Sequence, residues 1–139
     1  MIPSRIISHG PERPSQRELY KKLAEASSLI RAGKWFPANY DKLKPNFDDL
    51  ERTFRIETTL VEDQTKVLVT ALEEIRTEHY AGSRPPQKSY EPAAKGKDMF
   101  AFRWQSDFFT KTEMYLKFCL VGDDRNRQVC IFSIHEHKE

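Results

Sequence analysis

The chain contains only two cysteines in 139 residues, too few for the disulfide framework of a small secreted domain. We therefore interpret Cys119 and Cys130 as small, buried or half-buried residues of a protein in the reducing cytoplasm. No apolar run approaches the roughly 20 residues needed to cross a bilayer, so no membrane attachment is expected. The opening segment MIPSRIISHGPERP has no continuous apolar core, so we do not interpret it as a secretory signal.

A strong charge of one sign is also missing. The 23 basic and 21 acidic residues give a formal net charge of +2, which permits nucleic-acid binding without requiring it. Basic residues are nevertheless frequent in the C-terminal half, namely Arg84, Lys88, Lys95, Lys97, Arg103 and Lys117. A local basic cleft on a nearly neutral protein suits a polyanion that binds at one site.

The length predicts one domain, over residues 15–139, after a flexible segment over residues 1–14 that contains three prolines and a glycine. Ser15 is a good N-cap, and Glu18 three residues later completes a capping box. The pattern therefore predicts a helix that begins after Ser15 and ends at Gly33.

Two further helices are expected in the first half of the chain. We predict a loop over residues 34–46, because it contains Pro37 and Pro45, and then a short helix over 47–54. The aromatic pair of this loop, Trp35 and Phe36, is consistent either with a core position or with a partner-contact patch. A longer helix over 62–79 has an apolar face made of Val67, Leu68, Ala71, Leu72 and Ile75. Its charges, among them Glu73, Glu74 and Arg76, are interpreted as a solvated face.

Three strands are predicted in the C-terminal part, over residues 98–105, 113–121 and 128–138. A basic loop over 81–97 precedes them, and a polar turn over 122–127 joins the last two. The first strand places Phe100, Phe102 and Trp104 on one face, which we interpret as core rather than as a base-stacking surface. The expected fold is α+β, with N-terminal helices packed on one face of a small antiparallel sheet and the other face open to solvent.

Alternation along the last two strands separates apolar from polar side chains. We expect Met114, Leu116, Phe118 and Leu120 to share one apolar face with Cys130, Phe132 and Ile134. If Val121 pairs with Val129, Tyr115 lies opposite His135 and Lys117 opposite Ser133, with Cβ atoms roughly 4.5–5.5 Å apart. The same register places the two cysteines on opposite faces.

These polar side chains are suited to cleavage of a phosphodiester. RNA cleavage by its own 2′-hydroxyl needs a base, an acid and cationic groups near the phosphate. His135 can act as acid or base, Tyr115 can donate a proton, and Lys117 and Arg103 can stabilise the phosphate. Residues expected to contact the substrate are Lys88, His137, Lys95, Lys97, Gln105 and Ser133. The alternative is that these polar groups only solvate the sheet, since strands favour tyrosine and exposed lysine solubilises a surface.

A metal site is not expected, although His135 and His137 share a strand face. The chain has no cysteine or carboxylate cluster at structural-zinc spacing, and no cofactor is expected.

The C-terminal pattern resembles the MqsR family of bacterial toxins, which are mRNA interferases of the RelE-like fold. The matching segments are Tyr115-Leu116-Lys117 and Ser133-Ile134-His135-Glu136, with weaker similarity at Ser28–Phe36 and Lys88-Ser89. The chain departs from the family at His135, where MqsR toxins have lysine, and in the length of its 81–97 loop. No clear counterpart exists for a glutamine that the family has in its first core strand, and Arg103 or Gln105 can fill that place.

The resemblance implies a toxin of a type II toxin–antitoxin system that cleaves single-stranded mRNA, free or on the ribosome, without a metal. It also implies a cognate antitoxin as protein partner. The alternative is a non-catalytic RNA- or protein-binding module, such as an inactive toxin or an antitoxin-like or immunity-like partner. Replacement of His135 by glutamine distinguishes a nuclease, which loses turnover, from a binding module, which tolerates the change.

Overall fold

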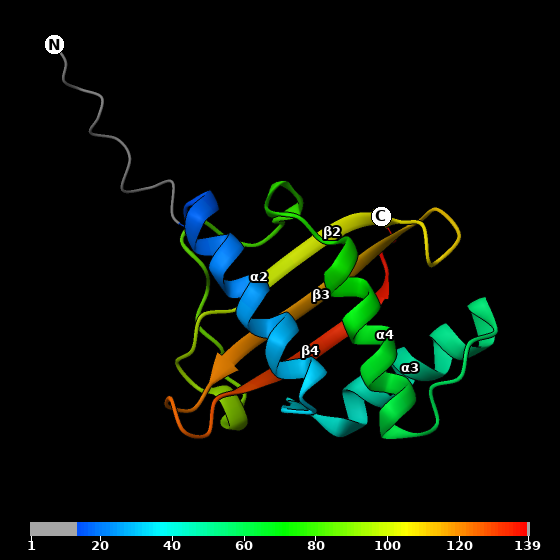
Figure 1. The fold of residues 1–139 in the computed structure, drawn as a ribbon, viewed down its shortest axis with the longest axis horizontal. Coiled ribbons are helices and arrows are strands. Elements are labelled where there is room, and N and C mark those ends of the chain that lie inside the picture. Colours follow the sequence, from blue (N-terminus) through cyan, green and yellow to red (C-terminus); the bar gives the residue numbers. More distant parts are fainter. Residues whose placement is uncertain (1–13, 139) are drawn as a thin grey trace, which may run out of the picture.

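The computed structural model describes residues 14–138, so most of the predicted flexible segment over residues 1–14 lies outside the described residues. Three helices pack on a four-stranded sheet whose order is β1-β4-β3-β2 (Figure 1). The elements are α2 Gln16–Arg31, β1 Trp35–Pro37, α3 Tyr40–Phe54, α4 Val61–Glu74, η2 Thr77–His79, η3 Pro92–Ala94, β2 Phe100–Ser106, β3 Thr112–Val121 and β4 Gln128–Glu136. The α+β class is confirmed, while the RelE/MqsR-like assignment stays a prediction.

Helix α2 begins as the sequence predicts. The Ser15 hydroxyl accepts a hydrogen bond from the Glu18 backbone N–H (3.1 Å), and the Ser15 backbone N–H donates to the Glu18 carboxylate (3.2 Å). The helix ends at Arg31, and Gly33 follows with a left-handed φ of 76°, a conformation that favours glycine. The capping signals therefore place both ends of this helix correctly.

The prediction of a loop over residues 34–46 is wrong. Trp35–Pro37 forms strand β1, which runs parallel to β4, and α3 begins at Tyr40 instead of residue 47. The side chain of Asn39 caps α3 by accepting from the Lys42 backbone N–H (3.2 Å). Pro45 lies on the exposed side of this helix, and the burial of Leu43 and Phe47 on the inner side outweighs its missing N–H.

The two aromatics of β1 are both packing residues. Trp35 packs against the main core, and its indole N–H donates to the Thr65 hydroxyl (2.8 Å). Phe36 points to the other face of the sheet, where it packs against a smaller buried cluster. The alternation of a strand explains why neighbouring aromatics serve different cores.

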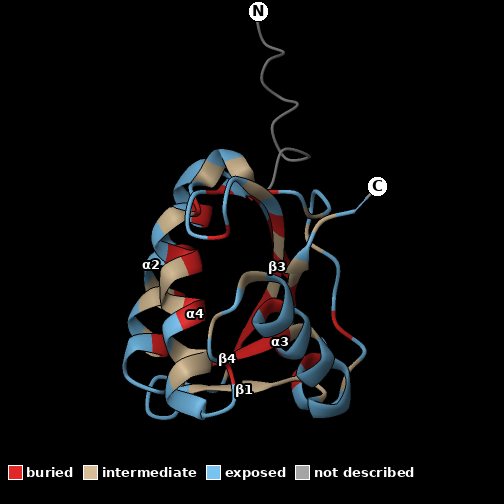
Figure 2. Cartoon of the chain, turned by 90° about the vertical axis from the view of Figure 1, so that its right-hand side faces the viewer, coloured by how far each residue is buried: buried red, intermediate tan, exposed pale blue. Residues whose placement is uncertain are grey.

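Helix α4 has the predicted inner face, but it ends at Glu74 rather than at His79. All five predicted inward residues are buried, namely Val67, Leu68, Ala71, Leu72 and Ile75. The chain turns at Ile75, whose backbone is extended, and Thr77–His79 form a short 3-10 helix. Figure 2 shows the buried residues concentrated on the sheet and on the sides of α2 and α4 that face it.

The interpretation of Glu74 as a solvated residue is wrong. Its carboxylate accepts hydrogen bonds from the Ser106 hydroxyl (2.6 Å), the Trp104 indole N–H (2.9 Å) and the Phe108 backbone N–H (3.0 Å). Burial is the largest single influence and opposes ionisation, but these hydrogen bonds together hold the pKa of Glu74 below its ordinary value. Glu74 thereby anchors the turn from β2 to β3 against the end of α4.

We expect Glu74→Gln to lower the free energy of unfolding by about 1–2 kcal/mol at pH 7, because three donors lose a charged acceptor. Since the folded pKa is lowered, the stabilisation from Glu74 is complete above the ordinary value of 4.5 and is lost as pH falls through the folded pKa. Urea titrations at pH 7 and pH 3 measure this difference. The control is Glu73→Gln, whose exposed ion pair with Arg31 is worth little. Equal stability of the two variants at pH 7 would contradict the anchoring role.

The core-facing side of the sheet is apolar on every long strand. Phe100, Phe102 and Trp104 of β2 are buried beneath the helices, as predicted. The rings of Phe102 and Phe118 stack with centroids 6.0 Å apart, which joins β2 to β3. The side chain of Arg103, between two of these aromatics, is exposed on the opposite face.

A β-bulge interrupts the pairing of β3 with β4. Tyr115 pairs with His135 and Lys117 with Ser133, as predicted, but Phe118 then pairs with Ile131 and leaves Phe132 as the extra residue. The expected pairing of Val121 with Val129 is therefore wrong, since Val121 pairs with Gln128 and Val129 with Leu120.

The bulge also changes which residues of β4 face the helices. Ile134 lies in the main core as predicted, but Cys130 and Phe132 lie in the smaller cluster on the other face. Their places in the main core are taken by Val129 and Ile131. The predicted common face of Cys130, Phe132 and Ile134 is wrong because one extra residue reverses the alternation.

The two cysteines are buried free thiols, paired across β3 and β4 on the same face. Their predicted burial is confirmed, but their predicted placement on opposite faces is wrong. Ala94 of η3 covers them, and the partly buried neighbours of this second cluster are Phe36, Ala38, Met99, Val121 and Phe132. The sheet face predicted to be open is thus covered at this end and accessible only at the other.

Candidate functional site

The accessible part of this face carries a row of three polar side chains across three strands. Arg103 of β2 pairs with Tyr115 of β3, which pairs with His135 of β4. The Tyr115 and His135 rings stack with centroids 5.3 Å apart and planes at 27°. The His137 ring is also close to Tyr115, with ring centroids 6.4 Å apart and planes at 29°. The structure therefore brings together four residues that the sequence predicted to lie in one site.

Lys117 and Ser133 form the next row, toward the covered end of the face. The Lys117 ammonium lies 5.7 Å from the centre of the Phe132 ring, a cation–π contact. Phe132 reaches this face because it is the bulge residue. The contact holds a positive charge one row away from the Tyr115–His135 pair.

Hydrogen bonds define the tautomers of the two histidines. His135 Nδ1 donates to the Glu136 backbone carbonyl (2.8 Å), since a carbonyl can only accept, and a neutral ring then has Nε2 as an acceptor. His137 Nε2 accepts from an Arg103 guanidinium N–H (3.1 Å), because arginine can only donate. Arg103 is also near the carboxylate of Glu113, with its Nε 3.4 Å from an oxygen. His135 is the imidazole with a basic nitrogen that has no partner among the described residues.

The phenol of Tyr115 is half-buried between its neighbours on the sheet. Burial raises the pKa of Tyr115 above its ordinary value, because the charged phenolate is less well solvated there. Tyr115 therefore keeps its proton at neutral pH. The arrangement places a proton donor beside a proton acceptor.

The remaining predicted substrate contacts lie away from this row. Lys88 forms an ion pair with Asp98 where the basic loop meets the start of β2. Gln105 donates to the Lys111 backbone carbonyl (3.2 Å) at the turn between β2 and β3. Lys95 and Lys97 are exposed on the loop over the cysteine pair.

A groove of about 510 Å³ lies beside His135, where the end of β4 meets α3, and no sequence signal predicted it. Its lining residues are Asn46, Asp49, Leu50, Arg52, Thr53, Phe54, His135, Glu136 and Lys138. The Asn46 side chain accepts from the Ile134 backbone N–H (2.9 Å) and so holds α3 against this strand. Glu113 was also missed, although its spacing of two residues from Tyr115 on a strand places it on the same face.

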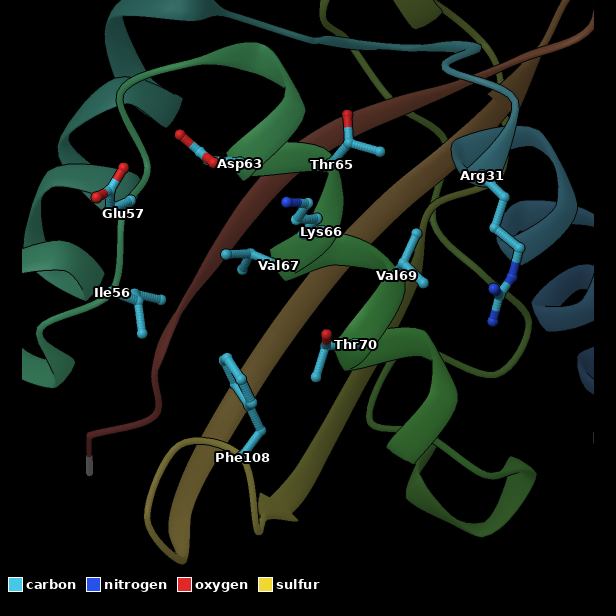
Figure 3. Close-up of a pocket in the computed structure, with 10 residues that line it drawn as sticks. All are labelled: Arg31, Ile56, Glu57, Asp63, Thr65, Lys66, Val67, Val69, Thr70 and Phe108. Carbon is cyan, nitrogen blue, oxygen red and sulfur yellow. The ribbon is translucent and has the colours of Figure 1, made fainter.

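A larger hollow of about 850 Å³ lies on the helical side of the molecule (Figure 3). Glu57 and Asp63 line one end of it and Arg31 the other, and Lys66 lies between them with its nitrogen toward the two acids. Arg31 is already paired with Glu73. Among the described residues, no histidine, cysteine or tyrosine lines this hollow, so it is a weaker candidate for acid–base chemistry than the row on the sheet.

Within residues 14–138, no group of three or more His, Cys, Asp or Glu side chains is placed to hold a metal ion. In the same part of the chain, no helix has both the length and the apolar composition needed to cross a bilayer.

Comparison with known proteins gives no relative: no protein-family model, no curated protein and no solved structure matches the chain. The resemblance to MqsR toxins therefore stays a prediction from the sequence.

Proposed function

We propose that this chain is a metal-independent endoribonuclease that cleaves single-stranded mRNA and acts as the toxin of a type II toxin–antitoxin system. The observation that carries the proposal is the stacked pair of Tyr115 and His135, with Arg103 in the same row. A proton acceptor, a proton donor and cationic groups are the components that RNA cleavage by the 2′-hydroxyl requires.

In the proposed reaction, His135 Nε2 removes the proton of a 2′-hydroxyl, and that oxygen attacks the adjacent phosphorus. The bond from phosphorus to the 5′-oxygen breaks, and the Tyr115 phenol gives its proton to the leaving oxygen. The products are a 2′,3′-cyclic phosphate and a free 5′-hydroxyl. Lys117 and Arg103 offset the negative charge that develops on the phosphoryl oxygens.

The raised pKa of Tyr115 supports its role as the acid, because the phenol remains protonated at the pH of a cell. The hydrogen bond from His135 Nδ1 to a carbonyl supports the role of Nε2 as the base. The proposal places the protein in the cytoplasm, where it meets mRNA, free or on the ribosome. A protein antitoxin would restrain its activity.

The proposal is tested by induced expression in a bacterial culture, beside the His135→Gln variant, with mapping of new mRNA 5′ ends. Growth arrest with new 5′-hydroxyl ends, both lost in the variant, is the expected result. Absence of arrest and of new ends, with folded protein present in the cells, would overturn the proposal in favour of a non-catalytic binding module.

A further inference from the structure

Tyr90 is the most solvent-exposed large hydrophobic side chain among those of residues 14–138, with 90% of its surface accessible. Its neighbour Ser89 is only 2% exposed, so the chain is buried at Ser89 and the next side chain, Tyr90, projects into solvent. An exposed aromatic ring does not contribute the folding free energy that burial of its apolar surface would normally provide. An aromatic in this position is therefore available to a ligand.

The loop that carries Tyr90 is held by hydrogen bonds at several points. The Ser89 backbone N–H donates to the Lys97 carbonyl (2.9 Å), and the Gly96 N–H donates to the Ser89 carbonyl (2.9 Å). The Ser89 hydroxyl accepts from the Glu91 backbone N–H (3.0 Å). Residues 88–98 thus form a small closed loop. A ring presented on a fixed backbone loses less conformational freedom when it binds.

This loop lies on the same face of the sheet as the candidate site. Ala94 packs against Cys119 and Cys130, and Cys119 follows Lys117 by two residues on β3. Lys117 is therefore located between the loop and Tyr115 on one continuous face. The loop adds the exposed ammonium groups of Lys95 and Lys97 to this track.

We infer that Tyr90 stacks on a base of single-stranded RNA whose backbone follows Lys117 from the candidate site toward the lysines of the 88–98 loop. The inference rests on the proposed function and extends it to the path of the substrate. Aromatic rings combined with basic groups along a backbone track are the general means of binding single strands without sequence preference. A protein-docking surface would instead need a contiguous apolar patch, and Tyr90 is the one exposed large hydrophobic residue of this loop.

The test measures binding of a fluorescent 12-nucleotide 2′-O-methyl RNA, which lacks the attacking hydroxyl and therefore remains intact. We expect Tyr90→Ala to weaken binding about 5- to 150-fold, the range for loss of one stacked base. Tyr90→Phe retains the ring and should bind within about twofold of the unmodified chain. The matched control is Tyr20→Ala, which removes an exposed ring (68% accessible) from α2 and should leave the affinity unchanged.

The outcomes separate the inference from the proposed function. If the unmodified chain cleaves RNA while Tyr90→Ala binds the oligonucleotide as tightly as the unmodified chain, the stacking role is overturned and the nuclease remains. Equal losses in Tyr90→Ala and Tyr20→Ala would also overturn it, because the effect would not be local. If the unmodified chain neither binds nor cleaves RNA, both proposals fail.

Discussion

His135→Gln is expected to lower kcat/KM for RNA cleavage by about 10²- to 10⁴-fold, the usual contribution of a general base. Glutamine preserves a polar side chain of similar reach, but its amide cannot accept the proton of the 2′-hydroxyl. Because the His135 ring stacks on Tyr115, the proposed base lies beside the proposed acid, and we expect the loss of cleavage rate to be specific to His135. Single-turnover cleavage of a fluorogenic oligoribonucleotide measures the effect, with affinity for the 2′-O-methyl RNA measured in parallel.

The matched control for this prediction is His79→Gln. His79 lies on the 3-10 helix η2 and accepts from the Arg76 backbone N–H (2.9 Å), away from the sheet face. The control should cleave at the rate of the unmodified chain. Cleavage that survives in His135→Gln, with affinity unchanged, would remove His135 from the mechanism and require another base.

Both cysteines are expected to resist thiol reagents in the folded protein and to react fully once it is unfolded. Burial is the main cause that raises the pKa of Cys119 to about 12 and that of Cys130 to about 11. Because the thiolate is the reactive form, the reactive fraction near pH 8 falls by about 100- to 1,000-fold relative to a free thiol. Colorimetric thiol titration with and without urea counts the accessible groups.

Single-thiol variants assign any signal that remains. Cys130→Ser leaves only Cys119, whose thiol is also near the Lys97 carbonyl oxygen (3.8 Å) under the loop. Slow labelling at the rate of global unfolding is the expected behaviour. Complete labelling of the native protein within minutes would indicate that the 88–98 loop opens readily, and would contradict the fixed presentation of Tyr90.

Alternation along a strand predicts neighbours well as long as the pairing is regular. It places Tyr115 opposite His135 and Lys117 opposite Ser133 correctly, because His135 and Ser133 lie on the C-terminal side of the bulge residue Phe132. On the N-terminal side of Phe132, the prediction places Cys130 on the wrong face of the sheet. No local sequence signal marks the bulge, which lies where β4 packs against the helices on one face and against the 88–98 loop on the other.

Among the helices, local signals are sufficient for α2, whereas tertiary contacts decide the extent of α3. Ser15 and Glu18 define the start of α2 by contacts within one turn, so the sequence is sufficient there. Pro45 suggests a loop by local rules, but the contacts of Leu43 and Phe47 with distant strands decide in favour of a helix. The groove beside His135 was missed because six of its nine lining residues belong to α3, and no sequence signal places this helix beside the end of β4.

The contact of Asn46 with Ile134 has a consequence for self-association. An exposed sheet edge offers unpaired N–H and C=O groups to other chains and promotes aggregation. Beyond β1, the Asn46 side chain takes one such N–H of β4. At the opposite edge, Ala81 donates to the carbonyl of Ala101 in β2 (2.8 Å). These contacts reduce the number of free backbone groups at each edge of the sheet. Strand β1 has only three residues and ends in Pro37, which has no N–H to offer, so it is a poor template for an added strand from another chain.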